Sequence, residues 1–339
     1  MKIRTILQGV CVFCACLPLW LRAQPNPAIE QYERTQRQMQ LPKPRTLNLS
    51  TNKEAPELYP GENADVGPQR ILRLTPRKTH FEVVADSQFL YTDNAYLSDN
   101  SKIDTTLFVN TIQAAFAPEP AKVGRGQFAP TLGYRSQWFN YDLAGGDEAL
   151  PHLDFTAQTA FLNGRYQLGE WQFFGGFDFT RLLDQSRYEE VYREYTPAIG
   201  LQRFITINDK LMIVVGGQFS YHFTDMQTNS GVGPDVNNRY ELGANISLNY
   251  EIIPRLILQP FYRFQYSEYR GFTDTETTPA APRYDYVHTA GASVAYYFNR
   301  NVAVRLFASY ECKDSSYSTG TYDYHKFDAG GGLTLDFRF

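Results

Sequence analysis

Between residues 79 and 339, apolar and polar side chains alternate with a period of two, and no other feature of the sequence limits the possible folds as strongly. The pattern is clearest from 239 to 251, where the apolar or aromatic set runs from Tyr240 to Tyr250 and the intervening positions are polar, charged or glycine. Residues 325–339 repeat it. A period of two belongs to a β-strand whose two faces differ. We therefore predict a sheet with one oily and one polar face.

The alternation divides into about twelve segments, a strand number found among membrane-spanning β-barrels. The predicted strands lie near 79–91, 104–117, 127–141, 152–166, 171–183, 188–204, 210–224, 238–252, 256–268, 284–298, 302–311 and 325–339.

The connections between these segments fall into two classes that alternate along the chain. Short turns are predicted at 168–170, 207–209, 253–255 and 299–301. Long polar loops are predicted at 142–151, 225–237, 269–283 and 312–324. Short turns at one end and long loops at the other are typical of outer-membrane barrels, and an even strand number brings both ends of the barrel chain to the same side.

Length and composition agree with a membrane-spanning sheet. The step from Tyr240 to Tyr250, at about 3.4 Å per residue and a tilt of about 40°, covers roughly 26 Å, close to an apolar band of about 25 Å. The 24 Tyr and 24 Phe suit two aromatic girdles. Each unpaired backbone group in lipid costs several kcal/mol, so the last strand must pair with the first. The predicted fold is all-β: a closed antiparallel transmembrane β-barrel over 79–339.

The first residues, 1–23, have the order of a secretory signal peptide: basic Lys2 and Arg4, a short apolar core, and Ala23 before Gln24. Cys16 offers an alternative lipoprotein site, although Phe13 fits that motif poorly. We expect cleavage near residue 23 and export to the outer membrane. The mature chain then retains one cysteine and can form no disulfide within itself.

Residues 24–78 carry eight prolines and no sustained periodicity, which predicts a mostly irregular periplasmic segment. A short charged helix is expected around residues 29–39. Two interpretations stay open: the segment is a flexible leader, or its apolar points near Leu58 and Ile71 dock to a partner or into the barrel mouth.

The polar face of the sheet is the best candidate for function. Charges on the lipid face would cost about 2 to 4 kcal/mol near the midplane, so they are expected to point inward. The mixture of signs argues against strong ion selectivity and allows either a narrow wet pore or a salt-bridged, nearly closed interior. The predicted pore-lining residues are Arg135, Asp178, Arg239, Glu241, Arg263, Arg305, Lys326 and Asp328.

Other chemistry finds little support in the sequence. Inward aromatics such as Phe174, Phe261 and Phe307 could stack on sugar rings, or simply fill space. The five histidines are scattered and no Gly-x-Ser-x-Gly motif occurs, so we predict no catalytic residues and no enzymatic activity. We also predict no metal site and no cofactor. The net charge of −4 gives nucleic-acid binding no support.

The end of the chain, with Phe339 terminal and Phe337 and Leu335 on the same face, resembles the C-terminal strand signal of Gram-negative outer-membrane proteins. The resemblance implies that the barrel-assembly machinery recognises this strand. It also implies contact with outer-membrane lipid and lipopolysaccharide.

The segment Tyr91–Ser98, followed by Lys102 and Asp104, resembles the first hairpin of a group of β-barrel porins. Some members of that group are associated with exopolysaccharide export, which implies a periplasmic export partner. The leading prediction is a porin-like channel for passive passage of small hydrophilic solutes or an exported glycan. The alternative is a structural or adhesive barrel with a blocked lumen, which binds partners through its loops or its N-terminal segment.

Overall fold

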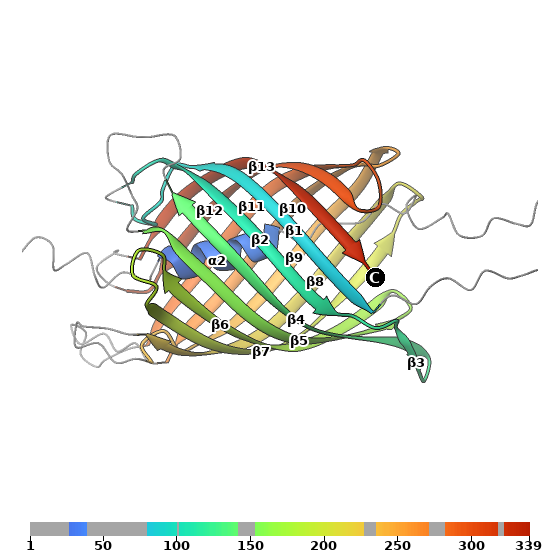
Figure 1. Cartoon of the computed structure of the whole chain (residues 1–339), viewed down its shortest axis with the longest axis horizontal. Coiled ribbons are helices and arrows are strands. Elements are labelled where there is room, and N and C mark those ends of the chain that lie inside the picture. The colour runs from blue at the N-terminus through green and yellow to red at the C-terminus, as the bar shows by residue number, and fades with distance from the viewer. Residues whose placement is uncertain are drawn as a thin grey trace, which may run out of the picture.

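The computed structural model describes residues 27–38, 80–99, 102–141, 153–226, 235–270, 282–317 and 322–339. These residues form an antiparallel β-barrel with one helix inside it (Figure 1). The strands are β1 (Phe81–Thr92), β2 (Thr105–Phe116), β3 (Ala121–Val123), β4 (Gly126–Tyr141), β5 (Phe155–Leu168), β6 (Trp171–Asp184), β7 (Glu190–Thr206), β8 (Leu211–Met226), β9 (Arg239–Ile253), β10 (Leu256–Tyr269), β11 (Arg283–Tyr297), β12 (Val302–Ser315) and β13 (Tyr324–Arg338).

The sheet closes on itself, as the cost of an open edge in lipid requires. β13 pairs with β1, from Arg338 opposite Glu82 to Asp328 opposite Thr92, and β2 pairs with β4. The short β3 extends only the hairpin before β4, so the other twelve strands form the ring. Each predicted strand coincides with one of these twelve, and the predicted fold class is confirmed.

The connections separate into two ends of the barrel. The short turns at 169–170, 207–210, 254–255 and 298–301 lie at what we call the turn end, where His80 also bonds to the C-terminal residue. The longer connections lie at the opposite end, called here the loop end, apart from the connection 117–125 with β3, which lies at the turn end. The halves of the lumen beside them are the loop half and the turn half.

The strand faces follow the predicted parity. On β9, Leu242 and Ile246 are exposed on the outside at 54% and 47%, whereas Glu241, next to Leu242, is 6% exposed and points into the barrel. On β13, Leu333 and Phe337 are likewise exposed, while Lys326 and Asp328 are buried. The period of two therefore places apolar side chains where lipid would contact them.

Inside the barrel lies the helix α2 (Pro27–Gln38), in the loop half of the lumen (Figure 1). Pro27 occupies the first helical position, where its missing N–H removes no hydrogen bond, and Glu30 places negative charge in the first turn. The short helix expected around 29–39 is thus present. Only this part of 24–78 is described, and the structure places it in the lumen rather than in the periplasm.

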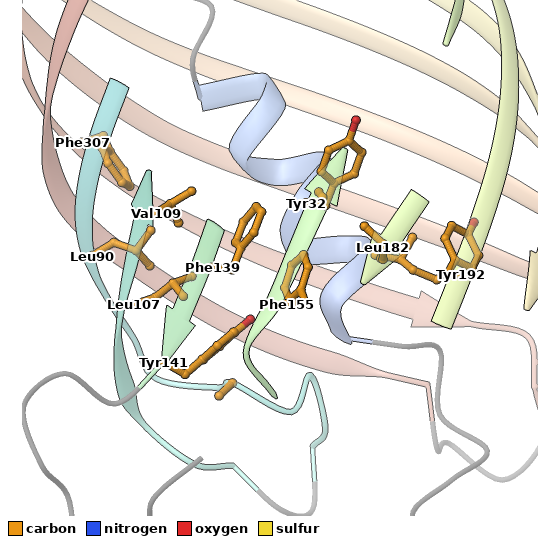
Figure 2. Close-up of a cluster of buried hydrophobic side chains, with 13 residues drawn as sticks. Tyr32, Leu90, Leu107, Val109, Phe139, Tyr141, Phe155, Leu182, Tyr192 and Phe307 are labelled. Carbon is orange, nitrogen blue, oxygen red and sulfur yellow. The ribbon is translucent and has the colours of Figure 1, made fainter. Parts of the chain in front are cut away.

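None of the helices described is long and apolar enough to cross a membrane. The helix α2 contributes instead to the barrel interior. Ile29 and Tyr32 join a buried cluster on the inner wall (Figure 2). The other members of that cluster, called here the apolar patch, are Leu90, Ala95, Leu107, Val109, Phe139, Tyr141, Phe155, Ala157, Leu182, Tyr192 and Phe307.

The apolar patch makes the inner face less polar than the sequence predicted, although Phe307, one of its members, was expected to point inward. Phe139 and Phe155, on neighbouring strands, stack with ring centroids 4.2 Å apart, and neither contacts lipid. An apolar surface inside a water-filled pore is unfavourable unless something covers it. The helix α2 provides that cover.

Candidate functional site

The helix α2 contacts the apolar patch through one of its faces. Ile29, Tyr32 and Gln36 share this face because they are spaced by three and four residues. The Tyr32 hydroxyl lies 2.6 Å from the hydroxyl of Thr159 and 3.2 Å from that of Thr180. Gln36 donates a hydrogen bond to Gln137 on β4. We call this side of α2 the anchor face.

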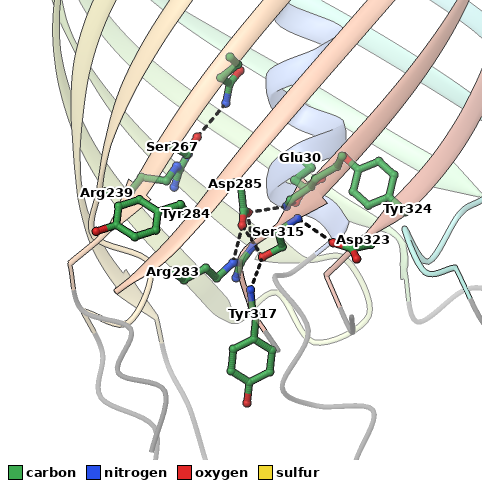
Figure 3. A network of polar contacts seen from close by, with 12 residues as sticks. Glu30, Arg239, Ser267, Arg283, Tyr284, Asp285, Ser315, Tyr317, Asp323 and Tyr324 are labelled. Carbon is green, nitrogen blue, oxygen red and sulfur yellow. Dashed lines mark hydrogen bonds and ion pairs between the residues drawn. The ribbon is translucent and has the colours of Figure 1, made fainter. Parts of the chain in front are cut away.

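A second face of α2, called the latch face, forms ion pairs with β12 and β13. Lys313 donates to Glu30 at 2.7 Å, and Tyr324 donates to the other oxygen of the same carboxylate at 2.6 Å (Figure 3). Arg34 pairs with Glu311 and lies 3.8 Å from Asp328. Because charge-assisted hydrogen bonds are stronger than neutral ones, these contacts fix both the depth and the rotation of the helix.

Between the two faces, Glu33 reaches a cluster of charges on β7, β8 and β9. Arg239 donates to Glu33 and, at 2.7 Å, to Glu241. The imidazole of His222 lies between two carboxylates, with Nδ1 2.9 Å from Glu194 and Nε2 3.3 Å from Glu241. Three carboxylates therefore share one guanidinium and one imidazole.

The two acidic residues of α2 differ in their electrostatic surroundings. Burial acts to raise the pKa of Glu30, but Lys313 and Arg34 outweigh it and the pKa is lowered from its ordinary value. Burial raises the pKa of Glu33 to about 7, although Arg239 opposes this shift. Glu30 is thus an anion held by two cations, whereas Glu33 competes with neighbouring carboxylates for Arg239.

The wall cations that bind α2 also have partners on the wall itself. Lys313 lies 3.0 Å from Asp285, and Arg239 bonds to Glu241 as described above. Lys326, which donates to Gln31 of α2 at 2.7 Å, lies 3.4 Å from Asp328. None of these three cations depends on the helix alone for its counter-charge.

The turn half of the lumen has a different character. Gln218 and Asn245 point inward with the same parity as His222 and Glu241, yet both are exposed, so water reaches them from within the barrel. Two residues nearer the loop end on β8, Ser220 is only 3% exposed. The lumen is therefore filled around α2, whereas water reaches Gln218 and Asn245 near the middle of their strands. Nearer the turn end of β9, the inward Asn249 and Glu251 are buried again.

A small cavity of about 40 Å³ lies between α2 and the wall formed by β9 to β13. Its lining includes Glu30, Glu33 and Arg34 of the helix together with Arg239 and Lys313 of the wall. The volume is sufficient for water molecules, which need about 10–15 Å³ of such space each. The contact between helix and wall is thus less tightly packed on this side.

The structure places all eight predicted pore-lining side chains on the lumen side. Arg239, Glu241, Lys326 and Asp328 gather around α2, and Arg135 donates to the Tyr32 hydroxyl at 3.3 Å.

The other three predicted residues have partners on the wall. Arg305 pairs with Asp86 at 2.9 Å, and Arg263 lies over the ring of Phe261 at 4.7 Å. Asp178 is partly buried and faces Arg135. That all eight line a conducting pore stays a prediction, as does the assembly role of Phe339, Phe337 and Leu335.

The sequence analysis did not identify the residues with which α2 binds the wall, namely Glu30, Glu33 and Arg34, or their partners Glu311 and Lys313. The charged pattern of 29–39 indicated a helix, but alternation cannot show which strand positions a helix inside the lumen will meet. Only the register of the closed barrel brings these charges together.

Two arrangements near Glu33 have the composition of chemical sites. The Ser220 hydroxyl lies 3.1 Å from Nε2 of His222, whose Nδ1 contacts Glu194, as in a nucleophilic triad. However, Glu241 also contacts Nε2, and the hydroxyl is buried. Glu33, His222 and Glu241 have donor atoms within 4.8 Å of one another, but Arg239 already binds both carboxylates, and we assign no metal to them.

Comparison with known proteins gives a partial family match. Residues 221–335, which include all of β9 to β12, match the family described as "Putative beta-barrel porin 2". The resemblance to β-barrel porins is confirmed, on strands other than the Tyr91–Ser98 hairpin that first indicated it. No curated protein sequence matches the chain significantly.

Solved barrels show a distant similarity. The "KdgM porin" is 12% identical, with 75% of this chain and 99% of that chain covered and a TM-score of 0.39. A "Bacterial polysaccharide outer membrane secretin" is 10% identical, with 77% and 98% covered and a TM-score of 0.41. The translocator domain of autotransporter NalP from Neisseria meningitidis is 15% identical, with 78% and 91% covered and a TM-score of 0.39.

Proposed function

We propose that this porin-like outer-membrane barrel is a passive channel for small hydrophilic solutes or an exported glycan. The observation that carries the proposal is the wetted middle of the lumen, where the inward amide side chains of Gln218 and Asn245 are exposed inside a closed ring of strands. The match of residues 221–335 to a porin family supports the same role.

The solute class follows from the inner wall. Cations and anions alternate around the lumen, so no single sign of charge would select ions strongly. Amide groups in the turn half, including Gln172 and Gln202, which hydrogen-bond at 2.6 Å, can donate to and accept from hydroxyl groups. Uncharged, hydroxyl-rich solutes therefore suit this surface better than ions do.

The inner wall gives less support to the idea that inward aromatic side chains stack on sugar rings. Phe307 belongs to the apolar patch, and Phe261 is covered by Arg263. A glycan would therefore be guided mainly by hydrogen bonds in the turn half.

Planar-bilayer conductance and swelling of liposomes in sugar solutions test the proposal on the purified full chain. A channel gives discrete current steps and lets small sugars enter the liposomes. Heat-modifiable migration on gels shows whether the barrel is folded. If the barrel is folded and the variant Glu30→Gln with Arg34→Gln, designed to release α2, shows neither signal, the protein is not a channel.

The second candidate is a structural or adhesive barrel with a blocked lumen. The observation that favours it is α2 itself, which fills the loop half with buried ion pairs. This candidate predicts no current in any variant that keeps the barrel intact. Binding by the loops would then be the function.

Export and assembly remain part of the proposal. We infer cleavage of a signal peptide near residue 23, recognition of the last strand by the barrel-assembly machinery, and contact with lipopolysaccharide outside. For a glycan exporter, a periplasmic partner would deliver the polymer to the turn end. Mass spectrometry of the mature N-terminus tests the cleavage site.

A further inference from the structure

We propose that α2 is a releasable plug, anchored on the apolar patch and latched to β12 and β13 by the ion pairs of its latch face, whose release opens the loop half of the lumen. The inference rests on the proposed channel function for its consequence, a current, but the movement of α2 can be measured separately.

The two faces of α2 bind the wall in different ways. On the anchor face, Ile29 and Tyr32 are buried against apolar side chains of the wall. Separating these side chains would expose apolar surface to water, which is unfavourable. On the latch face, Glu30 and Arg34 make contacts that are almost entirely ionic or hydrogen-bonded. Water can substitute for polar contacts at a small net cost, so the latch face is the side that can part from the wall.

The wall is built to tolerate that separation. A buried charge that loses its only partner is strongly destabilising. Here Lys313 keeps Asp285, and Arg239 keeps Glu241. Glu311 keeps the bond from Thr289 at 2.9 Å, and the Tyr324 hydroxyl, 2.8 Å away, can donate to it once Glu30 has left. Release of the latch therefore leaves these wall groups with a partner in place.

The helix also retains a counter-charge after release. Glu30 and Arg34 are four residues apart and lie 4.0 Å from each other on α2. Such a pair can close in the released state. The cavity beside both residues lets water enter the latch before the helix moves. We infer that opening begins on the β9 to β13 side while Tyr32 still contacts the apolar patch.

The test uses two charge-neutral double variants of the full chain. The latch variant, Glu30→Gln with Arg34→Gln, removes one carboxylate and one guanidinium from α2 and leaves every wall residue intact. The control variant, Glu82→Gln with Arg338→Gln, removes an ion pair of 2.8 Å at the turn end, where neither residue contacts α2. Both variants keep the net charge of the chain.

The position of α2 is reported by a cysteine probe. Thr35 is fully buried, and Thr35→Cys in a Cys312→Ser background places a thiol of similar size at a buried position of α2. Gln218→Cys in the same background reports whether a charged, membrane-impermeant maleimide reaches the lumen. Labelling rate and bilayer current are then measured for the parent, latch and control chains.

We expect the parent and control chains to protect Thr35→Cys while Gln218→Cys reacts. The latch variant should label Thr35→Cys about tenfold faster, which corresponds to about 1.4 kcal/mol of opening free energy, and should show more current. Equal labelling rates in the latch and parent chains would overturn the proposal, as would a parent in which Thr35→Cys reacts as fast as Gln218→Cys. Faster labelling without current would leave the release intact and overturn the channel function.

Discussion

At the scale of single residues, neighbouring positions on one strand face different surroundings, and these surroundings determine which side chains each position tolerates. Ile246 is 47% exposed on the outside near the middle of β9, and Asn245 beside it points into the lumen, where it is exposed to water. The same substitution at these two positions therefore meets either hydrocarbon or water.

This contrast can be measured with Ile246→Lys and Asn245→Lys. We expect Ile246→Lys to lower the free energy of unfolding in lipid by about 2 to 4 kcal/mol, because a charge near the midplane of the bilayer loses its hydration. Asn245→Lys should change it by about 0.5 kcal/mol or less. Urea unfolding in phospholipid vesicles, followed by tryptophan fluorescence, provides both values. Equal losses would show that the assigned faces of β9 are wrong.

Glycine matters where neighbouring backbones approach closely, as at Gly330. A Cβ added to Gly330 on β13 would lie 2.6 Å from the Cβ of Leu90 on β1, whereas at Gly217 the nearest atom would be 3.4 Å away. We expect Gly330→Ala to destabilise the seam between β1 and β13 by about 1 to 3 kcal/mol, and Gly217→Ala to be tolerated. The folded fraction on heat-modifiability gels compares the two variants.

At the scale of elements, α2 depends on the barrel more than on its own sequence. It has 12 residues, close to the lower limit of about 12 to 15 at which an isolated helix is marginal in water. Two of its side chains are apolar and buried, and the rest of its ordering comes from ion pairs with the wall.

The peptide 27–38 is therefore expected to show little helix by circular dichroism in buffer. The same peptide in trifluoroethanol should become helical, which shows that the sequence can form the helix when competing water is removed. A largely helical spectrum in buffer would mean that α2 is preformed and that the lumen only captures it.

At the scale of the whole molecule, closure of the ring is the property on which every inward contact depends. Ser87 on β1 is directly opposite Leu333 on β13, and both point outward. Side chains directly opposite on paired strands have Cβ atoms about 4.5 to 5.5 Å apart, a separation near that of a disulfide.

Closure can be tested with Ser87→Cys and Leu333→Cys in the Cys312→Ser background. Oxidation should link the two ends of the barrel chain and change its migration after boiling without reductant. The offset pair Ser87→Cys and Ala329→Cys, four positions out of register, should not link. Linking of both pairs alike would indicate an open or sliding edge instead of a fixed seam.

Much of the fold was predictable because alternation is local. The period of two from 239 to 251 is visible without any partner, and it assigns Glu241 inward and Leu242 outward whichever strand lies beside β9. The short turns and the length needed to cross the membrane then imply closure. The apolar patch was not predictable in this way, because inward apolar residues such as Phe139 and Phe155 look, in sequence, like lipid-facing ones.

The sequence by itself therefore determined the strands, their two faces and the charged character of 29–39, since each depends on the spacing of neighbouring residues. Only the tertiary structure decided that 27–38 lies in the lumen and that Glu30 meets Lys313, or Arg34 meets Glu311. Those contacts join residues almost three hundred positions apart, and their geometry depends on the register of the closed ring. Alternation carries no information about distances across a barrel.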